Sequence, residues 1–309
     1  MTDKERYRAL CEAGDLYVPL FQQAWWMDTV CHGKLWDVLL ARDGDAVVGA
    51  MPFLCGSKLG LSYILQPQLT PWSGPWLHPE LDDERRRAVL DSFATELRHR
   101  RTALFLQCFP PEVTDWQPFH WHGFRQTTRY THRFPSLADP DALYRSASRL
   151  RRRYDKAVAE QCFVDHELSV DEFAPFHAAY YRRQGQRDLI AEPLLRRVVE
   201  TSCSRGQGLL WGLRDHSSRS LQAAWFVAYD DRCAWSLLLA IGADAPHGAM
   251  SYLMWQMLRE LSHRTQMFDF EGGMDEKLAF FYRSFGTEQV PYHCVYRSAI
   301  PFGERLLHL

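Results

Sequence analysis

The stretch from Met267 to Gly286, MFDFEGGMDEKLAFFYRSFG, constrains the fold more than any other. Apolar β-formers surround Asp269 and Glu271 before a Gly-Gly pair, which predicts a short strand that points both carboxylates to one face. Asp275 then suits a helix N-cap, and apolar residues at helical spacing continue until Gly286. Ligand sites in open α/β sheets gather at such strand ends. The alternative is that both acids only cap the helix and solvate the turn.

The order of predicted elements occurs twice along the chain. In the first half, a hairpin with an Asp-Gly turn precedes a Pro-rich and aromatic-rich loop, a helix and a strand at Ala103 to Phe109. In the second half, a hairpin precedes a strand at Cys233 to Ile241, a helix at Gly248 to Leu261 and the strand that begins at Met267. This repetition predicts two copies of one α/β unit. The strand that comes late in each copy carries Gln107 and Cys108 in the first copy, but Asp269 and Glu271 in the second.

Composition narrows the class of protein. The net charge is −2, so no overall field favours non-specific binding to nucleic acid or to an anionic membrane. Eight scattered cysteines without a CxxC motif predict a reducing cytoplasm and no disulfides. No apolar run is long enough to span a membrane. We therefore expect a cytoplasmic protein without a membrane span.

Several residues carry a resemblance to a known family. The strand FDFEGG, the segment Ala279 to Gly286 (AFFYRSFG) and the order of elements resemble the GNAT acyltransferase superfamily, and more narrowly its FemAB-like branch with two tandem GNAT-type units. The resemblance covers most of the chain. It implies an α/β (α+β) fold with two tandem GNAT-like units, each a mixed, mostly antiparallel sheet flanked by helices. We place the acceptor-side unit at residues 1–138 and the donor and catalytic unit at residues 139–309.

The resemblance implies acyl transfer, which needs a base for the acceptor and an acid for the leaving group. Glu271 or Asp269 is the predicted base, and a Tyr before a glycine turn, Tyr282, is the general acid that the GNAT resemblance suggests. The competing interpretation of Tyr282 is that it belongs to the core. No metal is expected, because His120, His122 and His132 lack further ligands at fitting spacing.

The donor is expected at the loop IGADAPHGA, where small residues and free backbone N–H groups precede a helix. The predicted donor-binding residues are Ile241, Gly242, His247, Gly248, Ala249, Tyr252 and Arg283. An ordinary loop and N-cap would show the same pattern, and Arg283 could simply be solvated. The segment from Asp141 to Gln161 predicts a basic amphipathic helix, whose charged side has two interpretations as well, a solvated face or a grip on phosphates.

The acceptor is expected at the first unit's Pro-rich loop, with Gln66, Thr70 and Trp72 as its walls. The predicted function is N-acyl transfer from acyl-CoA, acetyl-CoA or an acyl carrier protein to a small-molecule amine. One alternative is FemAB-type aminoacyl transfer from tRNA to a peptidoglycan-like amine, although the chain has no room for the long helical arm of some tRNA-dependent members. The other is a catalytically silent binding module.

Overall fold

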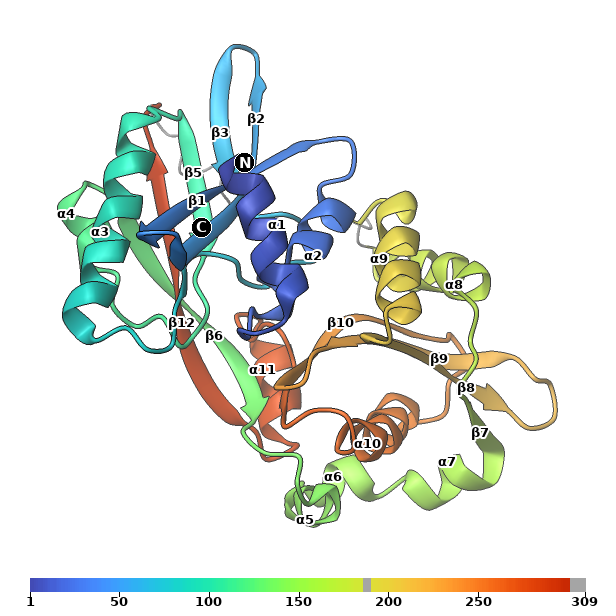
Figure 1. Ribbon diagram of the computed structural model, residues 1–309. Coiled ribbons are helices and arrows are strands. Elements are labelled where there is room, and N and C mark those ends of the chain that lie inside the picture. Colours follow the sequence, from blue (N-terminus) through green and yellow to red (C-terminus); the bar gives the residue numbers. More distant parts are fainter. Residues whose placement is uncertain (186–189, 301–309) are drawn as a thin grey trace. The chain divides into compact units, whose positions relative to one another are not determined.

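The protein forms two compact units in the computed structural model, which describes residues 1–185 and 190–300 (Figure 1). Unit 1 comprises Met1–Arg129 and Pro291–Leu309, and unit 2 comprises Tyr130–Val290. The sequence analysis placed a single boundary between residues 138 and 139. The observed division differs because the last strand, β12 (Glu288–Ser298), leaves unit 2 and pairs antiparallel with β5 (Leu104–Cys108) of unit 1.

Unit 1 is built on a mixed, mostly antiparallel sheet. Its strands run in the order β1-β2-β3-β5-β12, with β4 paired to β2, and only β3 and β5 are parallel. The strands that have not yet been given are β1 (Leu35–Asp43), β2 (Ala46–Lys58), β3 (Leu61–Leu65) and β4 (Trp76–Leu77). The predicted hairpin with an Asp-Gly turn is confirmed as β1 and β2, with Gly44 at a φ of 59°.

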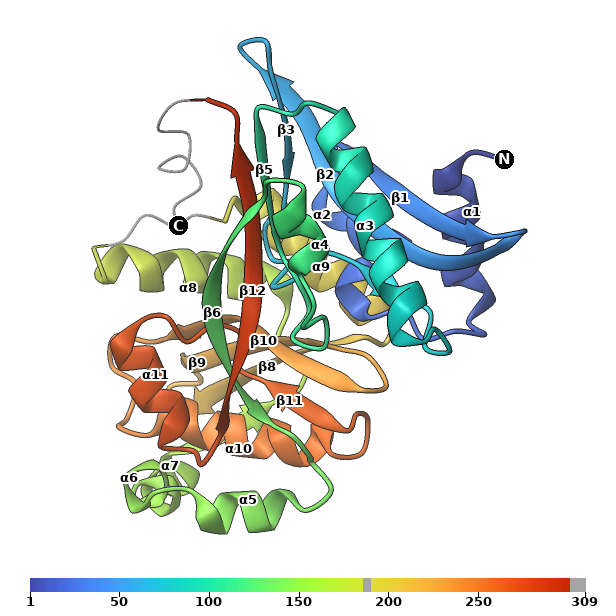
Figure 2. The ribbon, with the colours of Figure 1, turned by 90° about the vertical axis from the view of Figure 1, so that its left-hand side faces the viewer.

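Helices cover both faces of the unit 1 sheet (Figure 2). They are α1 (Asp3–Ala13), the 3-10 helix η1 (Leu20–Gln22), α2 (Ala24–Val30), α3 (Asp83–His99) and α4 (Gln117–Trp121). The core lies between the sheet and α3, where Phe53, Phe93 and Phe105 are buried. Burying each such side chain stabilises the fold by about 1.5 to 3 kcal/mol.

Unit 2 repeats this architecture with a longer sheet. Its strands run in the order β6-β11-β10-β9-β8-β7, and only β10 and β11 are parallel. They are β6 (Arg125–Phe134, which begins in unit 1), β7 (Cys162–Asp165), β8 (Gly208–Asp215), β9 (Leu221–Tyr229), β10 (Cys233–Ile241) and β11 (Met267–Asp269). The predicted mixed, mostly antiparallel sheet flanked by helices is therefore confirmed in each unit.

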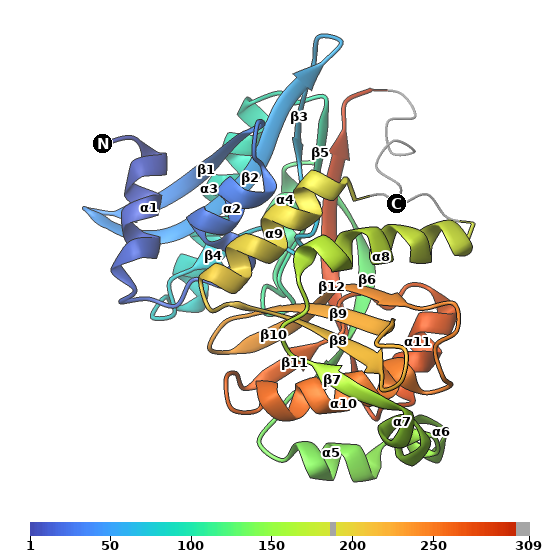
Figure 3. The ribbon, with the colours of Figure 1, turned by 90° about the vertical axis from the view of Figure 1, so that its right-hand side faces the viewer.

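Helices lie on both faces of the unit 2 sheet (Figure 3). Those on one face are α8 (Val170–Arg183) and α9 (Glu192–Ser204), and α10 (Ala249–Leu261) lies on the other, beside α5 (Pro140–Ser146), α6 (Arg149–Arg152) and α7 (Asp155–Gln161). The short α11 (Glu276–Arg283) follows β11. The core is aromatic, with Trp225, Trp255, Phe268 and Phe285 buried together.

The basic segment is three short helices rather than one long one. Helix α5 ends where Ala147, an extended residue with ψ of 148°, turns its methyl group into the core. Ser148 then starts α6, and its backbone N–H donates to the carbonyl of Ser284. The helix is interrupted here because tertiary contacts hold Ala147 and Ser148 outside helical geometry. Neither residue type by itself prevents a helix.

Candidate active site

The candidate site lies in unit 2, where two parallel strands separate. Strand β10 pairs with β11 only from Cys233 to Trp235, whereas its pairing with β9 continues to Ile241. A register shift between Ser236 and Leu238 marks a bulge in β10 at the point of separation. Helix α10 follows the far end of β10, and α11 follows the far end of β11. In open α/β sheets, ligands bind beside the carboxyl ends of strands where neighbouring strands diverge.

Helix α10 begins without a side-chain cap. Its N-cap is Gly248, at a φ of 91°, and no side chain accepts from the first turn. A Cβ at Gly248 would come within 2.8 Å of the Tyr154 Cβ, so both the backbone and the space require glycine. The Ala249 N–H donates to the Pro246 carbonyl, whereas the other N–H groups of the first helical turn lack intrahelical partners, and the helix dipole gives them positive character. This helix start is therefore able to bind an anion.

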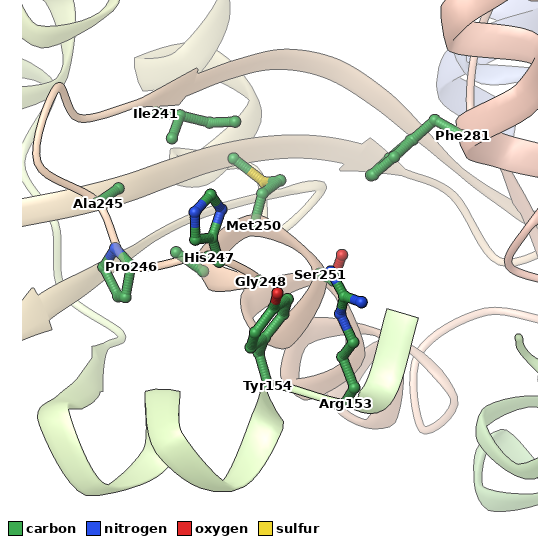
Figure 4. A pocket seen from close by; sticks show the side chains of 11 residues that line it. Arg153, Tyr154, Ile241, Ala245, Pro246, His247, Gly248, Met250, Ser251 and Phe281 are labelled. Atoms are coloured by element: carbon green, nitrogen blue, oxygen red, sulfur yellow. The ribbon is translucent and has the colours of Figure 1, made fainter. Parts of the chain in front are cut away.

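A pocket of about 360 Å³ lies at this helix start (Figure 4). The Arg153 guanidinium lies 4.4 Å from the centre of the Tyr154 ring, and that ring stacks on His247 with centroids 5.7 Å apart. Phe281 of α11 also lines the pocket. A cationic side chain, stacked rings and free N–H groups suit a phosphate-bearing ligand with an apolar part.

Four predicted donor-binding residues meet at this pocket, namely Ile241, His247, Gly248 and Ala249. The other three lie elsewhere. Gly242 continues the sheet, because its N–H donates to the Gln222 carbonyl at 2.7 Å. Tyr252 packs against the unit 2 core, and Arg283 is exposed. Their part in donor binding stays a prediction, and Arg153 and Tyr154 join the site through the segment whose role the sequence left open.

Only one of the two predicted carboxylates lies on the strand. Strand β11 ends at Asp269, and Glu271 has a φ of 52°, a left-handed conformation that an ordinary side chain rarely adopts. The predicted strand, which continued to Glu271, is therefore shorter in the structure because the backbone leaves the extended conformation at Glu271. The Glu271 N–H donates to Asp269 Oδ1 at 2.8 Å, so the first carboxylate holds the turn that carries the second.

Asp269 is fully buried in a hydrogen-bonded ion pair. Its carboxylate accepts from Thr131 Oγ1 at 2.5 Å, from the Glu271 N–H and from Arg133 Nε. Burial raises the pKa of Asp269, and the charge of Arg133 and the donated hydrogen bonds oppose that rise. With three donated hydrogen bonds and no exposed surface, Asp269 holds the turn that carries Glu271, whose side chain is partly exposed.

Tyr282 lies beside Glu271 and is 4% exposed. Its ring packs against Phe270, with centroids 4.8 Å apart, and against His132 at 5.7 Å. Burial raises the pKa of Tyr282 well above its ordinary value, and the charges of Glu271 and Asp269 raise it further. The phenol is thus protonated at neutral pH, as a general acid must be, even though the ring also belongs to the core.

His132 is the residue that the sequence analysis did not place in the active site. It is fully buried on β6, and its Nδ1 lies 3.1 Å from Thr287 Oγ1, whereas its Nε2 has no hydrogen-bond partner among the described residues. A Cβ at Gly273 would come within 2.9 Å of His132 Cδ2, so the glycine turn lies directly on the imidazole. Burial lowers the pKa of His132, and the positive charge of Arg283 lowers it further.

The predicted acceptor residues hold the unit 1 loop together. The Gln66 amide donates to the carbonyls of Thr70 and Pro71 and accepts from the Cys108 N–H at 2.6 Å. Thr70 Oγ1 accepts from the Trp26 indole at 3.0 Å. Trp72 is 2% exposed and packs edge-on against Tyr292. Because these groups engage one another, acceptor binding by Gln66, Thr70 and Trp72 stays a prediction.

Neither a metal cluster nor a membrane helix is found in the part of the chain that the structure describes. Residues 1–185 and 190–300 contain no group of three or more His, Cys, Asp or Glu side chains that could hold a metal ion. His120 and His122 belong to α4 and its C-cap rather than to a strand. None of the described helices is long and apolar enough to cross a membrane.

The sequence matched no family model and no curated protein. Solved structures are nevertheless similar over nearly the whole chain. FemX has a TM-score of 0.70 at 13% identity, covering 95% of this chain and 96% of FemX. L-PGS from Bacillus licheniformis has a TM-score of 0.58 at 13% identity, covering 99% and 95%. A tandem GNAT protein from the clavulanic acid biosynthesis pathway has a TM-score of 0.59 at 13% identity, covering 96% and 94%. The chain therefore has a GNAT-like fold with FemAB-like structural neighbours.

Proposed function

We propose that this chain is an N-acyltransferase that moves an acyl group from a CoA-type thioester, or from an acyl carrier, to an amine. The observation that carries the proposal is the uncapped start of α10, which faces a pocket edged by Arg153. The GNAT-like fold supports acyl or aminoacyl transfer in general. Acyl-CoA or acetyl-CoA is the donor that best fits a phosphate site beside an apolar wall.

In this proposal the first turn of α10 binds a donor phosphate. Met250 and Ser251 of the first turn line the pocket, where their N–H groups would bind the phosphate, and Arg153 adds a full positive charge. Each charge near the helix end gains about 0.3 to 1 kcal/mol from the dipole alone. The donor would extend from this phosphate along the end of β10, past Ile241 and Phe281 of the pocket wall, toward Glu271.

The chemistry is assigned to the strand ends. The acceptor amine attacks the thioester carbonyl while Glu271 takes its proton, directly or through a water molecule. Backbone N–H groups of β10 beyond Trp235, where the parallel pairing with β11 has ended, stabilise the oxyanion. Tyr282 donates its proton to the departing thiolate. Asp269 keeps the turn before Glu271 in place through the hydrogen bond to its N–H.

A second candidate is aminoacyl transfer from tRNA to a peptidoglycan-like amine. The similarity to FemX over most of the chain favours considering it. The two donors differ in a measurable property, because binding of tRNA through many phosphates weakens steeply with salt. A catalytically silent binding module would bind a donor without any transfer.

The test is a thermal-shift panel followed by product analysis. CoA, acetyl-CoA, a longer acyl-CoA, acylated carrier protein and aminoacyl-tRNA are added separately, and transfer to a set of amines is followed by mass spectrometry. We expect the CoA compounds to raise the unfolding temperature and an acylated amine to form. Stabilisation by tRNA alone, with a steep salt dependence, would replace the CoA proposal by the second candidate. Binding of CoA without any transfer to the amines would favour the binding module.

A further inference from the structure

Two cysteines face each other across neighbouring strands of unit 1. Cys108 on β5 and Cys294 on β12 are direct partners in the antiparallel register, and their Sγ atoms lie 3.0 Å apart. Neither cysteine is in a disulfide, and both are buried, at 4% and 0% exposure. The two cysteines are 186 residues apart in the sequence, yet their thiols are in direct contact.

The backbone around the pair has the geometry that a cross-strand disulfide needs. The Phe109 N–H donates to the His293 carbonyl, and the Cys108 N–H donates to Gln66 instead of to β12. Cys108 and Cys294 therefore form a non-hydrogen-bonded pair, in which Cα atoms are about 4.5 Å apart. Disulfides span Cα separations of about 4.4 to 6.8 Å, so the bond can form without moving either strand far.

The pair also differs chemically from the other thiols. Burial raises the pKa of Cys11, Cys31, Cys55, Cys162 and Cys203. The pKa of Cys294 is lowered, because the Cys108 thiol donates a hydrogen bond to its sulfur and the positive charge of Arg129 favours the thiolate. Since the thiolate is the nucleophile, Cys294 is the sulfur that reacts first with an oxidant.

We propose that Cys108 and Cys294 form a reversible disulfide when the protein meets a hydroperoxide such as hydrogen peroxide. The Cys294 thiolate attacks one peroxide oxygen, which breaks the O–O bond, releases hydroxide and leaves a sulfenic acid. The Cys108 sulfur then attacks the Cys294 sulfur, the S–S bond forms, and the sulfenic oxygen leaves as water with the thiol proton. The two sulfurs together lose two electrons, and the peroxide gains them.

The disulfide would link β12 covalently to β5, next to the loop that contains Gln66, Thr70 and Trp72. Gln66 already bonds the Cys108 N–H, and Tyr292 on β12 packs against Trp72 with ring centroids 5.6 Å apart. A covalent link that closes so long a stretch of chain constrains the unfolded state strongly. We therefore expect the oxidised protein to unfold at a higher temperature than the reduced protein.

The experiment maps disulfides in the full chain. Folded, reduced protein is treated with hydrogen peroxide, alkylated under denaturing conditions, digested without reductant and analysed by mass spectrometry. Cys203→Ser, which removes the exposed thiol, and Cys108→Ala are treated in parallel. A sample oxidised in urea shows which pairings form without the fold.

We expect one dominant linked peptide, Cys108 to Cys294, in the wild type and in Cys203→Ser, and its loss after dithiothreitol. Cys108→Ala should yield no such link, and the oxidised wild type should show the higher unfolding temperature. Oxidation confined to other cysteines, with Cys108 and Cys294 both still alkylated, would overturn the proposal. So would a Cys108 to Cys294 link that is no more abundant in the folded protein than in urea. Each result is independent of whether the chain transfers acyl groups.

Discussion

The helix that precedes the late strand begins differently in the two units. In unit 1, α3 has Asp82 as its N-cap, which accepts from the Arg85 N–H at 2.8 Å, and Asp83 and Glu84 lie in its first turn. In unit 2, α10 begins at Gly248 with no side-chain cap and no acidic residue in its first turn. Carboxylates cap the start of α3 and repel anions, whereas no side chain caps the start of α10 and no carboxylate in its first turn would repel an anion.

The strands that follow these two helices also differ, because only the strand of unit 2 carries a carboxylate. In unit 1, β5 carries Gln107, a buried neutral amide that donates to the Pro52 carbonyl at 2.8 Å. In unit 2, β11 ends at the buried carboxylate of Asp269, which positions Glu271. The two units thus have similar architecture but differ in which helix start has a side-chain cap and in which strand carries a carboxylate. The fold alone therefore does not determine where a site lies. The predictions below test this contrast.

The largest effect is expected for Glu271→Gln. Removing a positioned base typically lowers the rate by about 10² to 10⁴. Turnover should fall by this factor, and donor binding by calorimetry should remain unchanged. Gln107→Leu, the counterpart change in unit 1, should leave turnover nearly unaltered. If Gln107→Leu folds normally yet loses activity as strongly as Glu271→Gln, the chemistry would belong to unit 1 instead.

Asp269→Asn should destabilise unit 2. The change leaves Arg133 buried without its counter-charge, which typically costs about 3 to 5 kcal/mol. Urea unfolding measures this free energy. The matched control is the double variant Asp269→Leu with Arg133→Met, which removes both charges and should recover much of the loss. Equal stability of Asp269→Asn and wild type would show that the ion pair does not hold the turn.

Asp82→Ala tests the unit 1 helix start. Loss of an N-cap should lower the free energy of unfolding by about 1 kcal/mol, as measured in urea. Donor affinity should not change, because in this account α3 binds no ligand. A marked loss of donor affinity in this variant would mean that both helix starts contribute to binding, and the contrast between the units would fail.

The smallest effect concerns pH and His132. Its folded pKa lies below the ordinary value of 6.5, so the unfolded chain takes up the proton first as the pH falls. The stability that neutral His132 contributes is complete above that value and is lost as the pH falls toward the folded pKa. Unfolding temperatures between pH 7 and pH 5 should therefore decline less in His132→Gln than in wild type. His263→Gln, at an exposed position, should keep the wild-type decline.

Local sequence patterns predicted the strands and helices that depend mainly on nearby residues. The apolar run from Cys233 to Ile241 is strand β10 with the same limits, and the helical spacing after Gly248 is α10. The small residues before that helix were enough to indicate the pocket at its start, because an uncapped helix start is visible in sequence as a missing Ser, Thr or Asp. Arg153 and Tyr154 could be named only as part of a basic segment.

The rest depends on contacts between distant segments. No local pattern shows that β12 returns to pair with β5, so the sequence could not show that β12 from Pro291 onward groups with unit 1. The left-handed backbone at Glu271 is imposed by the buried Asp269 carboxylate, whose partners Thr131 and Arg133 are far away in sequence. For the same reason His132 was considered only as a metal ligand, since its contacts with Thr287 and Tyr282 arise from the pairing of β6 with β11.

The central claim is that the start of α10 binds the donor, and calorimetric titration with CoA tests it most directly. Gly248→Ala closes the pocket against Tyr154, whereas Gly206→Ala imposes similar backbone strain, at a φ of 68°, on a glycine with no neighbouring atom within 4 Å. We expect Gly248→Ala to weaken CoA binding by about tenfold or more, ~1.4 kcal/mol, and Gly206→Ala to bind like wild type. Equal CoA affinity in wild type and Gly248→Ala would contradict the account.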